Sequence, residues 1–291
     1  MTALRTAVAV ARSAARGVSR DRVPMMGAAL AYYTVFSIAP LLVLSMAAAG
    51  LLLGGVDSRI FASIQSVVGP NGAAAIRSMV DAAASKPHAG MVASILGFVT
   101  LIVGASGVFT QLQESLDVIW KAQPRPGAGW LHLARQRLMS FAMIGVIAFL
   151  LLASLLVSAA LSAAGSVMAG AIPGGARAWS LVDLGVSFAI VSLLFAAIFK
   201  VLPDVRLRWR DVAAGGAFTG LLFAVGKQLI GLYIGKSGLA SAYGAVGSLV
   251  VVLVWVFYSS QILLVGAEFT RAVVTRHGHW PPAKPGARLV R

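Results

Sequence analysis

The sequence predicts an all-α, polytopic membrane protein: a bundle of six transmembrane helices preceded by an amphipathic helix. Of its 291 residues, 59% are hydrophobic and only 11% are charged, and the mean hydropathy is +0.88. A soluble domain carries about 25% charged residues. The chain also holds several apolar runs of about 20 residues, which is the length of helix that crosses a bilayer. Composition and run length together exclude a soluble globular domain.

Residues 1–24 are predicted to form a basic arm with an amphipathic helix over 3–22. One face of this helix carries Arg5, Arg12, Arg16 and Arg20, and another carries Leu4, Val8, Ala11, Ala15 and Val18. Such a pattern is typical of a helix that lies on an anionic leaflet, so membrane lipids are the expected partners. A basic arm that only sets topology is the alternative, and the two readings are compatible.

The six predicted spans cover about residues 28–53, 91–110, 138–161, 179–202, 212–234 and 246–267. The first holds 26 uncharged residues, roughly 39 Å of helix, so it spans with some tilt. An amphipathic helical hairpin is predicted over 54–90, with its turn at Gly69-Pro70-Asn71-Gly72. Residues 276–291 are polar and contain proline, and are predicted to be a flexible tail.

The distribution of positive charge predicts the orientation. Most of the 24 lysines and arginines lie in the N-terminal arm, the second-to-third and fourth-to-fifth loops, and the tail. The opposite loops hold only Arg59, Arg77, Lys86, Arg177 and Lys236. By the positive-inside rule both termini are cytoplasmic. The net charge of +15 is then a topology signal, and no nucleic-acid partner is expected because no stretch interleaves basic and aromatic residues.

Lys227 is the most informative single residue, because it is charged and lies inside the fifth span. A charge at that depth costs a few kcal/mol, so it is predicted to face another helix or a cavity. The same helical face carries a small-residue stripe, which favours close helix packing. Its glycines are Gly216, Gly220, Gly231 and Gly235. An anion contact is the functional interpretation, and a lysine that snorkels outward is the structural one.

The first span has a polar face that includes Tyr33, Ser37 and Pro40. Pro40 removes one backbone donor, so a kinked helix lining a pathway is one interpretation and ordinary packing is the other. In the sixth span, Gln261 lies deep enough to favour an interhelical hydrogen bond. These residues and Lys227 are the predicted substrate pathway.

Charged side chains also gather at the inner ends of the spans. Glu114 and Asp117 follow the second span, Glu268 ends the sixth, and Arg208 lies in a basic loop. The alternatives are an inner gate, charges that face water, and a structural ion-pair cluster with Arg206, Arg208, Arg210 or Arg271. No histidine lies near the two acids that are one turn apart, so no metal site and no cofactor are predicted.

Five segments resemble the YihY/virulence factor BrkB family, once labelled ribonuclease BN. They are AALAYYTVFSIAPLL (28–42), LDVIW (116–120), FKVLPDVRLRWRD (199–211), GKQLIGLYIG (226–235) and YGAVGSLVVVLVWVFYSSQILLVGAEF (243–269). Their order and spacing cover about residues 25–275. One departure is Asp117, where the family often has asparagine.

The resemblance implies a multi-pass protein of the bacterial inner membrane that is similar to transporters or exporters, with lipid or amphiphilic substrates proposed for some members. Together with Lys227 in the fifth span, it leads us to expect transport or export of a lipid-like or anionic amphiphile. A structural or scaffold role in the envelope is the alternative, and assembly into a homo-oligomer stays open. Enzymatic activity is not expected. A ribonuclease needs clustered acid–base or metal-binding groups, and the nine acids and four histidines are dispersed.

Overall fold

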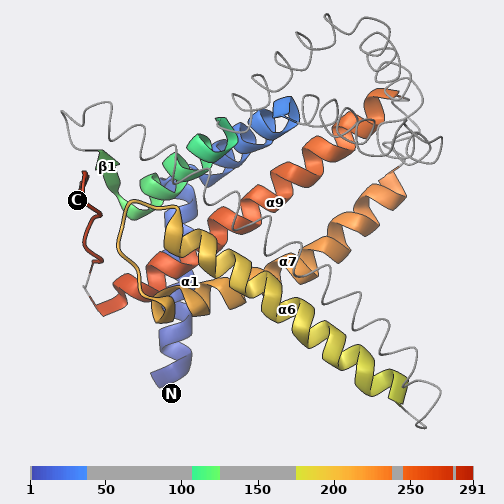
Figure 1. Cartoon of the computed structure of the whole chain (residues 1–291), viewed down its shortest axis with the longest axis horizontal. Coiled ribbons are helices and arrows are strands. Elements are labelled where there is room, and N and C mark those ends of the chain that lie inside the picture. Colours follow the sequence, from blue (N-terminus) through green and yellow to red (C-terminus); the bar gives the residue numbers. More distant parts are fainter. Residues whose placement is uncertain (1, 38–106, 125–174, 238–244, 278–279, 291) are drawn as a thin grey trace, which may run out of the picture. The chain divides into compact units, whose positions relative to one another are not determined.

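The computed structural model describes residues 2–37, 107–124, 175–237, 245–277 and 280–290 (Figure 1). The chain divides into two compact units. The first unit comprises Met1–Pro24, Gln113–Lys227 and Gln261–Arg291. The second comprises Met25–Leu112 and Gln228–Ser260.

Three long helices dominate the described residues: α6 (Gly175–Val201), α7 (Trp209–Ser237) and α9 (Ala245–Val274). Each contains a segment long and apolar enough to cross a membrane, namely Leu184–Val201, Trp209–Ile230 and Val250–Val274. These segments correspond to the predicted fourth, fifth and sixth spans. The described part of the chain is therefore mainly helical, with three candidate membrane helices.

The other predicted spans fall largely outside the described residues. Of the first, only the part within the helix Val23–Ser37 is described. Of the second, only the start of helix 107–120 is described, whereas the third span and the hairpin over 54–90 lie wholly outside.

Local chemistry explains how α6 ends and α7 begins. Pro203 disfavours helix in the preceding residue, and α6 ends at Val201. At the start of α7, the carboxylate of Asp211 accepts a hydrogen bond from the backbone N–H of Arg208 at 2.9 Å. This side chain reaches back from the first turn to a free backbone donor, as in half of a capping box.

Helix α1 (Thr2–Arg20) confirms the predicted N-terminal helix but buries a different face. Val10 and Ala14 pack with Ala272 of α9, and Phe269 and Val273 flank this contact. Val8, on the predicted apolar face, is 50% exposed. The predicted apolar face is therefore distinct from the one that docks on α9, because helical rotation places Val10 and Ala14 about 100° or more from Val8.

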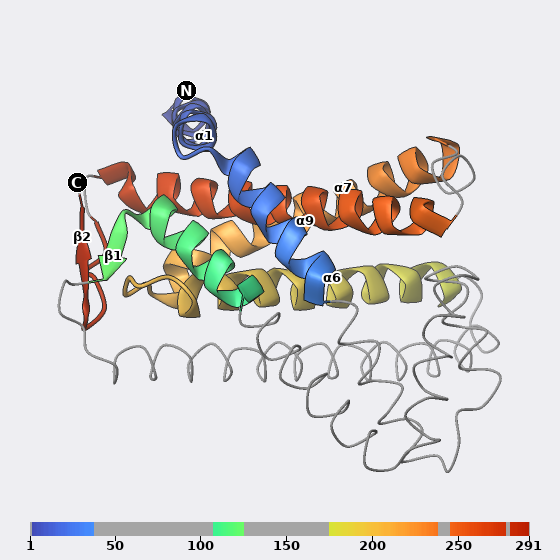
Figure 2. The same cartoon turned by 90° about the horizontal axis from the view of Figure 1, so that it is seen from above.

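The predicted flexible tail is wrong for residues 280–290. Strand β2 (Ala287–Leu289) pairs antiparallel with β1 (Ala122–Pro124), and Figure 2 shows the two strands side by side. The tail also donates from Lys284 N–H to the carbonyl of Asp204 at 2.9 Å. Backbone pairing with two distant loops thus orders a segment whose composition indicated disorder.

Helices α7 and α9 meet through a reciprocal arrangement of glycine and threonine. Thr219 on α7 donates to the carbonyl of Gly215, and Thr270 on α9 donates to the carbonyl of Gly266, both at 2.7 Å. A Cβ added at Gly215 would meet Thr270 Oγ1, and one added at Gly266 would meet Thr219 Oγ1. Each threonine hydroxyl is thus satisfied within its own helix and fills the space opposite the partner's glycine, so the two backbones approach closely.

Helix α7 packs against α6 through part of the predicted glycine stripe. A Cβ at Gly216 would lie 2.5 Å from the carbonyl oxygen of Ser192, and one at Gly220 would lie 2.5 Å from the Ser192 hydroxyl. The prediction that these two glycines mediate helix packing is confirmed. The structure does not describe the surroundings of Gly231 and Gly235.

Candidate functional site

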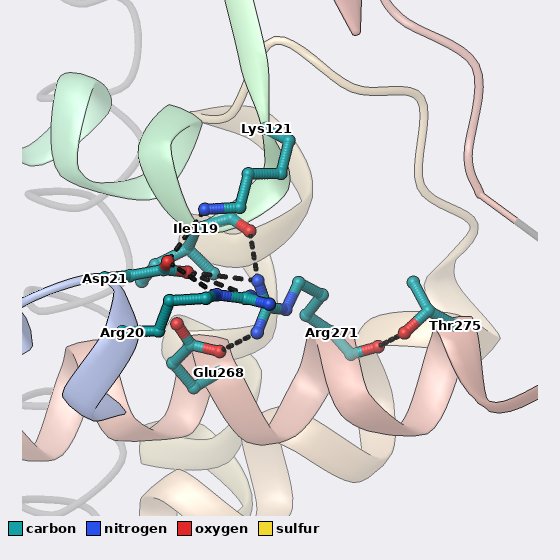
Figure 3. A network of polar contacts seen from close by, with 7 residues as sticks. All are labelled: Arg20, Asp21, Ile119, Lys121, Glu268, Arg271 and Thr275. Carbon is teal, nitrogen blue, oxygen red and sulfur yellow. Dashed lines mark hydrogen bonds and ion pairs between the residues drawn. The ribbon is translucent and has the colours of Figure 1, made fainter. Parts of the chain in front are cut away.

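A set of charges around the buried residues Asp21, Glu268 and Arg271 joins segments from three parts of the chain in the first unit. We call it the Asp21 cluster, and it consists of Arg20, Asp21, Lys121, Glu268 and Arg271 (Figure 3). Asp21 lies directly after α1 and Lys121 follows helix 107–120. Arg20 is the last residue of α1, and Glu268 and Arg271 belong to α9. The cluster therefore holds elements together that are remote in sequence.

Arg271 is the centre of this cluster. Its Nη1 donates to Asp21 Oδ2 at 3.1 Å and to the carbonyl oxygen of Ile119 at 3.0 Å, and its Nη2 lies 2.6 Å from Glu268 Oε2. The Ile119 carbonyl is near the C-terminus of helix 107–120, where carbonyls lack helical donors. One guanidinium therefore neutralises two carboxylates and caps a neighbouring helix, as Figure 3 shows.

Glu268 is fully buried at 0% exposure and reaches Arg271 across one turn of α9. Both residues lie within the apolar segment Val250–Val274. Gly17 of α1 makes room for them, because a Cβ there would meet the carboxylate of Glu268 and the guanidinium of Arg271. The approach of α1 to the ion pair thus requires glycine at this position.

Asp21 is fixed by a sharp turn and by three cations. Its N–H donates to the carbonyl of Gly17 at 2.8 Å, and Arg22 follows with a φ of 53°. Lys121 Nζ lies 2.7 Å and Arg20 Nε 3.1 Å from Oδ1. Burial acts to raise the pKa of Asp21, but the hydrogen bonds from Arg20 and Lys121 outweigh it and lower the pKa to about 2. Asp21 is therefore an anion at neutral pH.

Asp117 belongs to a second buried contact. Its Oδ1 accepts a 2.6 Å hydrogen bond from the backbone N–H of Asp204, in the loop between α6 and α7. Burial raises the pKa of Asp117 to about 8, and the charge of Asp204 adds to this, against the hydrogen bond that favours the anion. Burial and the nearby Asp204 carboxylate thus make an anion at position 117 costly.

The predicted inner-end charges are only partly brought together. Glu268 pairs with Arg271, which was one of the alternatives, and Asp117 binds the loop at Asp204. Glu114 is exposed on helix 107–120. Arg208 is exposed too, and its backbone N–H, rather than its side chain, donates the hydrogen bond to Asp211 at the start of α7.

The predicted pathway residues are divided between the units, with Lys227 and Gln261 in the first and Tyr33 and Ser37 in the second. Lys227 is exposed, and the expected contact with another helix is not found among the described residues. Tyr33 is 39% exposed, and in the second unit its ring would meet a Cβ at Gly107 at 3.0 Å. Ser37 donates to the carbonyl of Thr34 at 2.8 Å, within its own helix. Pro40 lies outside the described residues.

Gln261 forms an interhelical hydrogen bond, as its depth predicted. Its Nε2 donates to the carbonyl oxygen of Pro24 at 3.4 Å, linking α9 to the start of the helix Val23–Ser37. Pro24 has no N–H to offer the helix, but its carbonyl remains an acceptor. The carbonyl of Pro24 is therefore the partner through which Gln261 contributes to helix packing.

Sequence reasoning missed Asp21, Lys121 and the glycine–threonine pairs. Asp21 was hidden because its arm reads as purely basic, although it is the only acid among the first 24 residues. The repeated spacing Gly-x-x-x-Thr at 215–219 and 266–270 was visible as a small-residue motif. Which of the many small residues would meet could not be read without the helix rotations.

The chemistry of the Asp21 cluster is that of paired, desolvated charges. In the part of the chain that the structure describes, no three histidine or acidic side chains are arranged to hold a metal ion. Its strong groups are guanidinium and ammonium donors, which bind carboxylates and phosphates. The cluster can therefore lock helices together, or release them when its ion pairs are exchanged for others.

Comparison with known proteins gives a consistent relationship. The chain is 28% identical over 269 residues to a UPF0761 membrane protein of Pseudomonas aeruginosa, covering 89% of this chain and 61% of that protein. It is 27% identical over 272 residues to a UPF0761 membrane protein of Tolumonas auensis, covering 91% and 84%. The chain thus spans about three fifths of the length of the first relatives it matches. No solved structure matches the chain.

The model of the family described as Virulence factor BrkB matches residues 14–288. The match begins within α1 and ends within β2, so it takes in every member of the Asp21 cluster and all three long helices. Apolar helices, membrane-protein relatives and this match agree, and the chain belongs to the Virulence factor BrkB family of membrane proteins.

Proposed function

We propose that the chain transports or exports an anionic, lipid-like amphiphile across the bacterial inner membrane, with both termini in the cytoplasm. In this proposal the Asp21 cluster is the inner gate. Lys227 is a candidate contact for the negative headgroup, and no catalytic step, metal or cofactor takes part.

One observation carries the proposal: a fully buried carboxylate and a buried guanidinium lie within the apolar segment of α9. Ionisable groups inside a membrane helix are expensive, and they characteristically mark the path of a substrate or ion. Arg271 is 5% exposed, and it holds Glu268, Asp21 and the Ile119 carbonyl at once. An anionic headgroup that competes for this guanidinium would loosen contacts among α1, helix 107–120 and α9.

A structural or scaffold role is the second candidate, and the packing of α7 on α9 favours it. Gly215 and Gly266 leave no room even for a methyl group opposite Thr270 and Thr219. At that level α7 and α9 are in direct contact, as in a static support. In this alternative, the Asp21 cluster is a permanent clamp and Lys227 snorkels towards the headgroups.

Reconstituted vesicles distinguish the two candidates. The chain is inserted into vesicles with a trace of fluorescent phosphatidylglycerol or phosphatidylcholine, and dithionite bleaches the outer leaflet. Protein-dependent bleaching of the inner-leaflet phosphatidylglycerol, faster than that of phosphatidylcholine, supports transport of an anionic amphiphile. If vesicles with protein protect both inner-leaflet labels as well as protein-free vesicles do, the transport proposal is overturned and the scaffold is favoured.

Variants then assign the gate. Glu268→Gln removes one buried charge and is expected to change the rate of phosphatidylglycerol movement at least fivefold, because Arg271 loses an anionic partner. Glu114→Gln is the matched control, since it removes an exposed acid of the same unit. Equal rates for both variants and the parent chain would remove the Asp21 cluster from the mechanism.

A further inference from the structure

A pocket of about 430 Å³ opens between α1 and the end of α9, beside the Asp21 cluster. This volume falls within the range of small-ligand sites, about 300–1,000 Å³. The pocket is lined by Ser13, Arg16, Gly17, Ser19, Arg20 and Arg271. All six residues belong to the first unit, so the pocket is a feature of one compact body.

The pocket keeps unbalanced positive charge. Three arginines line it, and Arg20 and Arg271 share the carboxylates of Asp21 and Glu268 with Lys121. Arg16 pairs with no carboxylate among the described residues. Four cationic side chains therefore meet two acids, and an anion can enter without displacing the existing pairs.

The shape of the pocket also suits an oxyanion. Ser13, Arg16, Gly17 and Arg20 are spaced by three or four residues, so they share one face of α1. Gly17 presents bare backbone in the middle of this face, against the Glu268–Arg271 pair. Serine hydroxyls donate single hydrogen bonds, and guanidinium groups bind phosphate oxygens in a bidentate manner. The lining thus offers donors from several directions.

The position of the pocket indicates which anions reach it. Arg271 lies three residues before the end of the apolar segment Val250–Val274, a rise of about 4.5 Å along the helix. Polar headgroups flank the hydrocarbon core at the ends of such segments. Arg16 and Arg20 are exposed, so the pocket is also open to ions in solution.

We propose that this pocket binds a phosphate group, carried either by an anionic lipid headgroup or by a free phosphate. Arg16 supplies the uncompensated charge, Arg20 and Arg271 supply further donors, and the hydroxyls of Ser13 and Ser19 complete the site. The inference does not depend on transport, because a scaffold protein could bind the same group.

The lipid arm of the test uses the delipidated 291-residue chain in detergent, titrated with phosphatidylglycerol or phosphatidylcholine and followed by native mass spectrometry. Phosphatidylglycerol is expected to bind at least fivefold more tightly. Arg16→Gln should weaken its binding about tenfold, as expected for one charge-assisted contact. Arg16→Lys, which keeps the charge, should lose less. Arg12→Gln is the matched control: an exposed arginine of the same helix that does not line the pocket, expected to stay within twofold.

The free-phosphate arm titrates inorganic phosphate into the same samples by calorimetry. Free phosphate is a ligand if three results agree. Inorganic phosphate binds the parent chain, its affinity falls about tenfold in Arg16→Gln, and it displaces phosphatidylglycerol. Phosphatidylglycerol binding that shows the Arg16 dependence while inorganic phosphate does not bind identifies the lipid headgroup. Either result supports the site.

Two results would overturn the inference. One is equal weakening by Arg12→Gln and Arg16→Gln, which would reduce binding to the general charge of α1. The other is a parent chain that neither prefers phosphatidylglycerol nor binds phosphate. Melting temperatures of all variants, measured in the same detergent, verify that each is folded. Should Arg16→Gln fail this check, Ser13→Ala replaces it, with an expected loss of about threefold.

Discussion

The guanidinium of Arg271 donates to the carboxylate of Asp21 at 3.1 Å, although the two residues are 250 positions apart. This contact fastens the turn after α1 to the end of α9. The same guanidinium holds Glu268 and the end of helix 107–120. Arg271 thus connects three separate elements: the turn after α1, helix 107–120 and α9.

Arg271→Met is expected to destabilise the folded chain by about 3–5 kcal/mol, because it leaves Glu268 and Asp21 without their shared cation. The double variant Arg271→Met with Glu268→Met should recover part of this loss, since it also removes the unpaired buried carboxylate. Unfolding followed by tryptophan fluorescence in detergent measures both. If the double variant loses more unfolding free energy than the two single variants lose together, a buried, mutually compensating pair is contradicted.

Asp117→Asn is expected to stabilise the chain, and the gain should depend on pH. The pKa of Asp117 is raised from 3.8 to about 8, so ionisation costs nothing below pH 3.8, costs progressively more as pH rises towards 8, and levels off above it. Asparagine keeps the acceptor for the Asp204 N–H without the charge.

The size of this effect follows from about 1.4 kcal/mol per pKa unit, which gives a few kcal/mol at pH 9. Melting temperatures of the parent chain and of Asp117→Asn at pH 5 and pH 9 measure it. The difference should be larger at pH 9. Asp211→Asn is a useful comparison, because the Asp211 carboxylate caps a helix start and should show no such gain. A difference that does not grow with pH would contradict a buried, protonated Asp117.

Gly266→Ala is expected to destabilise the contact of α7 with α9 by about 1–3 kcal/mol, because the new methyl group meets the Thr219 side chain. Gly185→Ala is the matched control: it lies in α6 with nothing within 4 Å of the added Cβ. That substitution should be neutral or slightly stabilising, since alanine favours helix. Combining Gly266→Ala with Thr219→Ala should restore part of the loss. Chemical or thermal unfolding in detergent is the measurement.

The tail is expected to resist hydrogen exchange. Val290 N–H donates to the carbonyl of Lys121 at 2.8 Å, and β2 pairs with β1. Amides of Ala287–Leu289 and Val290 should therefore exchange at least tenfold more slowly than the rate for an unstructured peptide, by exchange mass spectrometry. Deleting residues 287–291 should in turn speed exchange at the amides of Ala122 and Gln123. Exchange of the intact tail at the unstructured rate would contradict the pairing.

The sequence predicted the class of the fold well because long apolar runs have few alternatives. In segments such as Val250–Val274, hydropathy alone predicts a helix long and apolar enough to cross a membrane, and the structure has such a helix there. The glycine stripe was also predictable in part, since Gly216 and Gly220 pack on α6 as expected. Local periodicity was sufficient for both.

The charged contacts were less predictable because they depend on long-range geometry. Nothing local distinguishes Asp21, which is buried among cations, from Glu114, which is exposed. The tail misled for a related reason: its hydrogen-bond partners, at Lys121 and Asp204, are more than 75 positions away. That Lys227 faces another helix or a cavity stays a prediction, because its side chain is exposed in the described part of the chain.

The reciprocal glycine–threonine contact has a consequence for motion in the membrane. Because each helix carries both a notch and the side chain that fills the other's notch, sliding α7 along α9 by even a part of a turn would drive a threonine into backbone. Axial sliding is therefore blocked in both directions. If the protein changes shape during its work, these two helices travel together in the described region, and rearrangement falls to the contacts made by ion pairs.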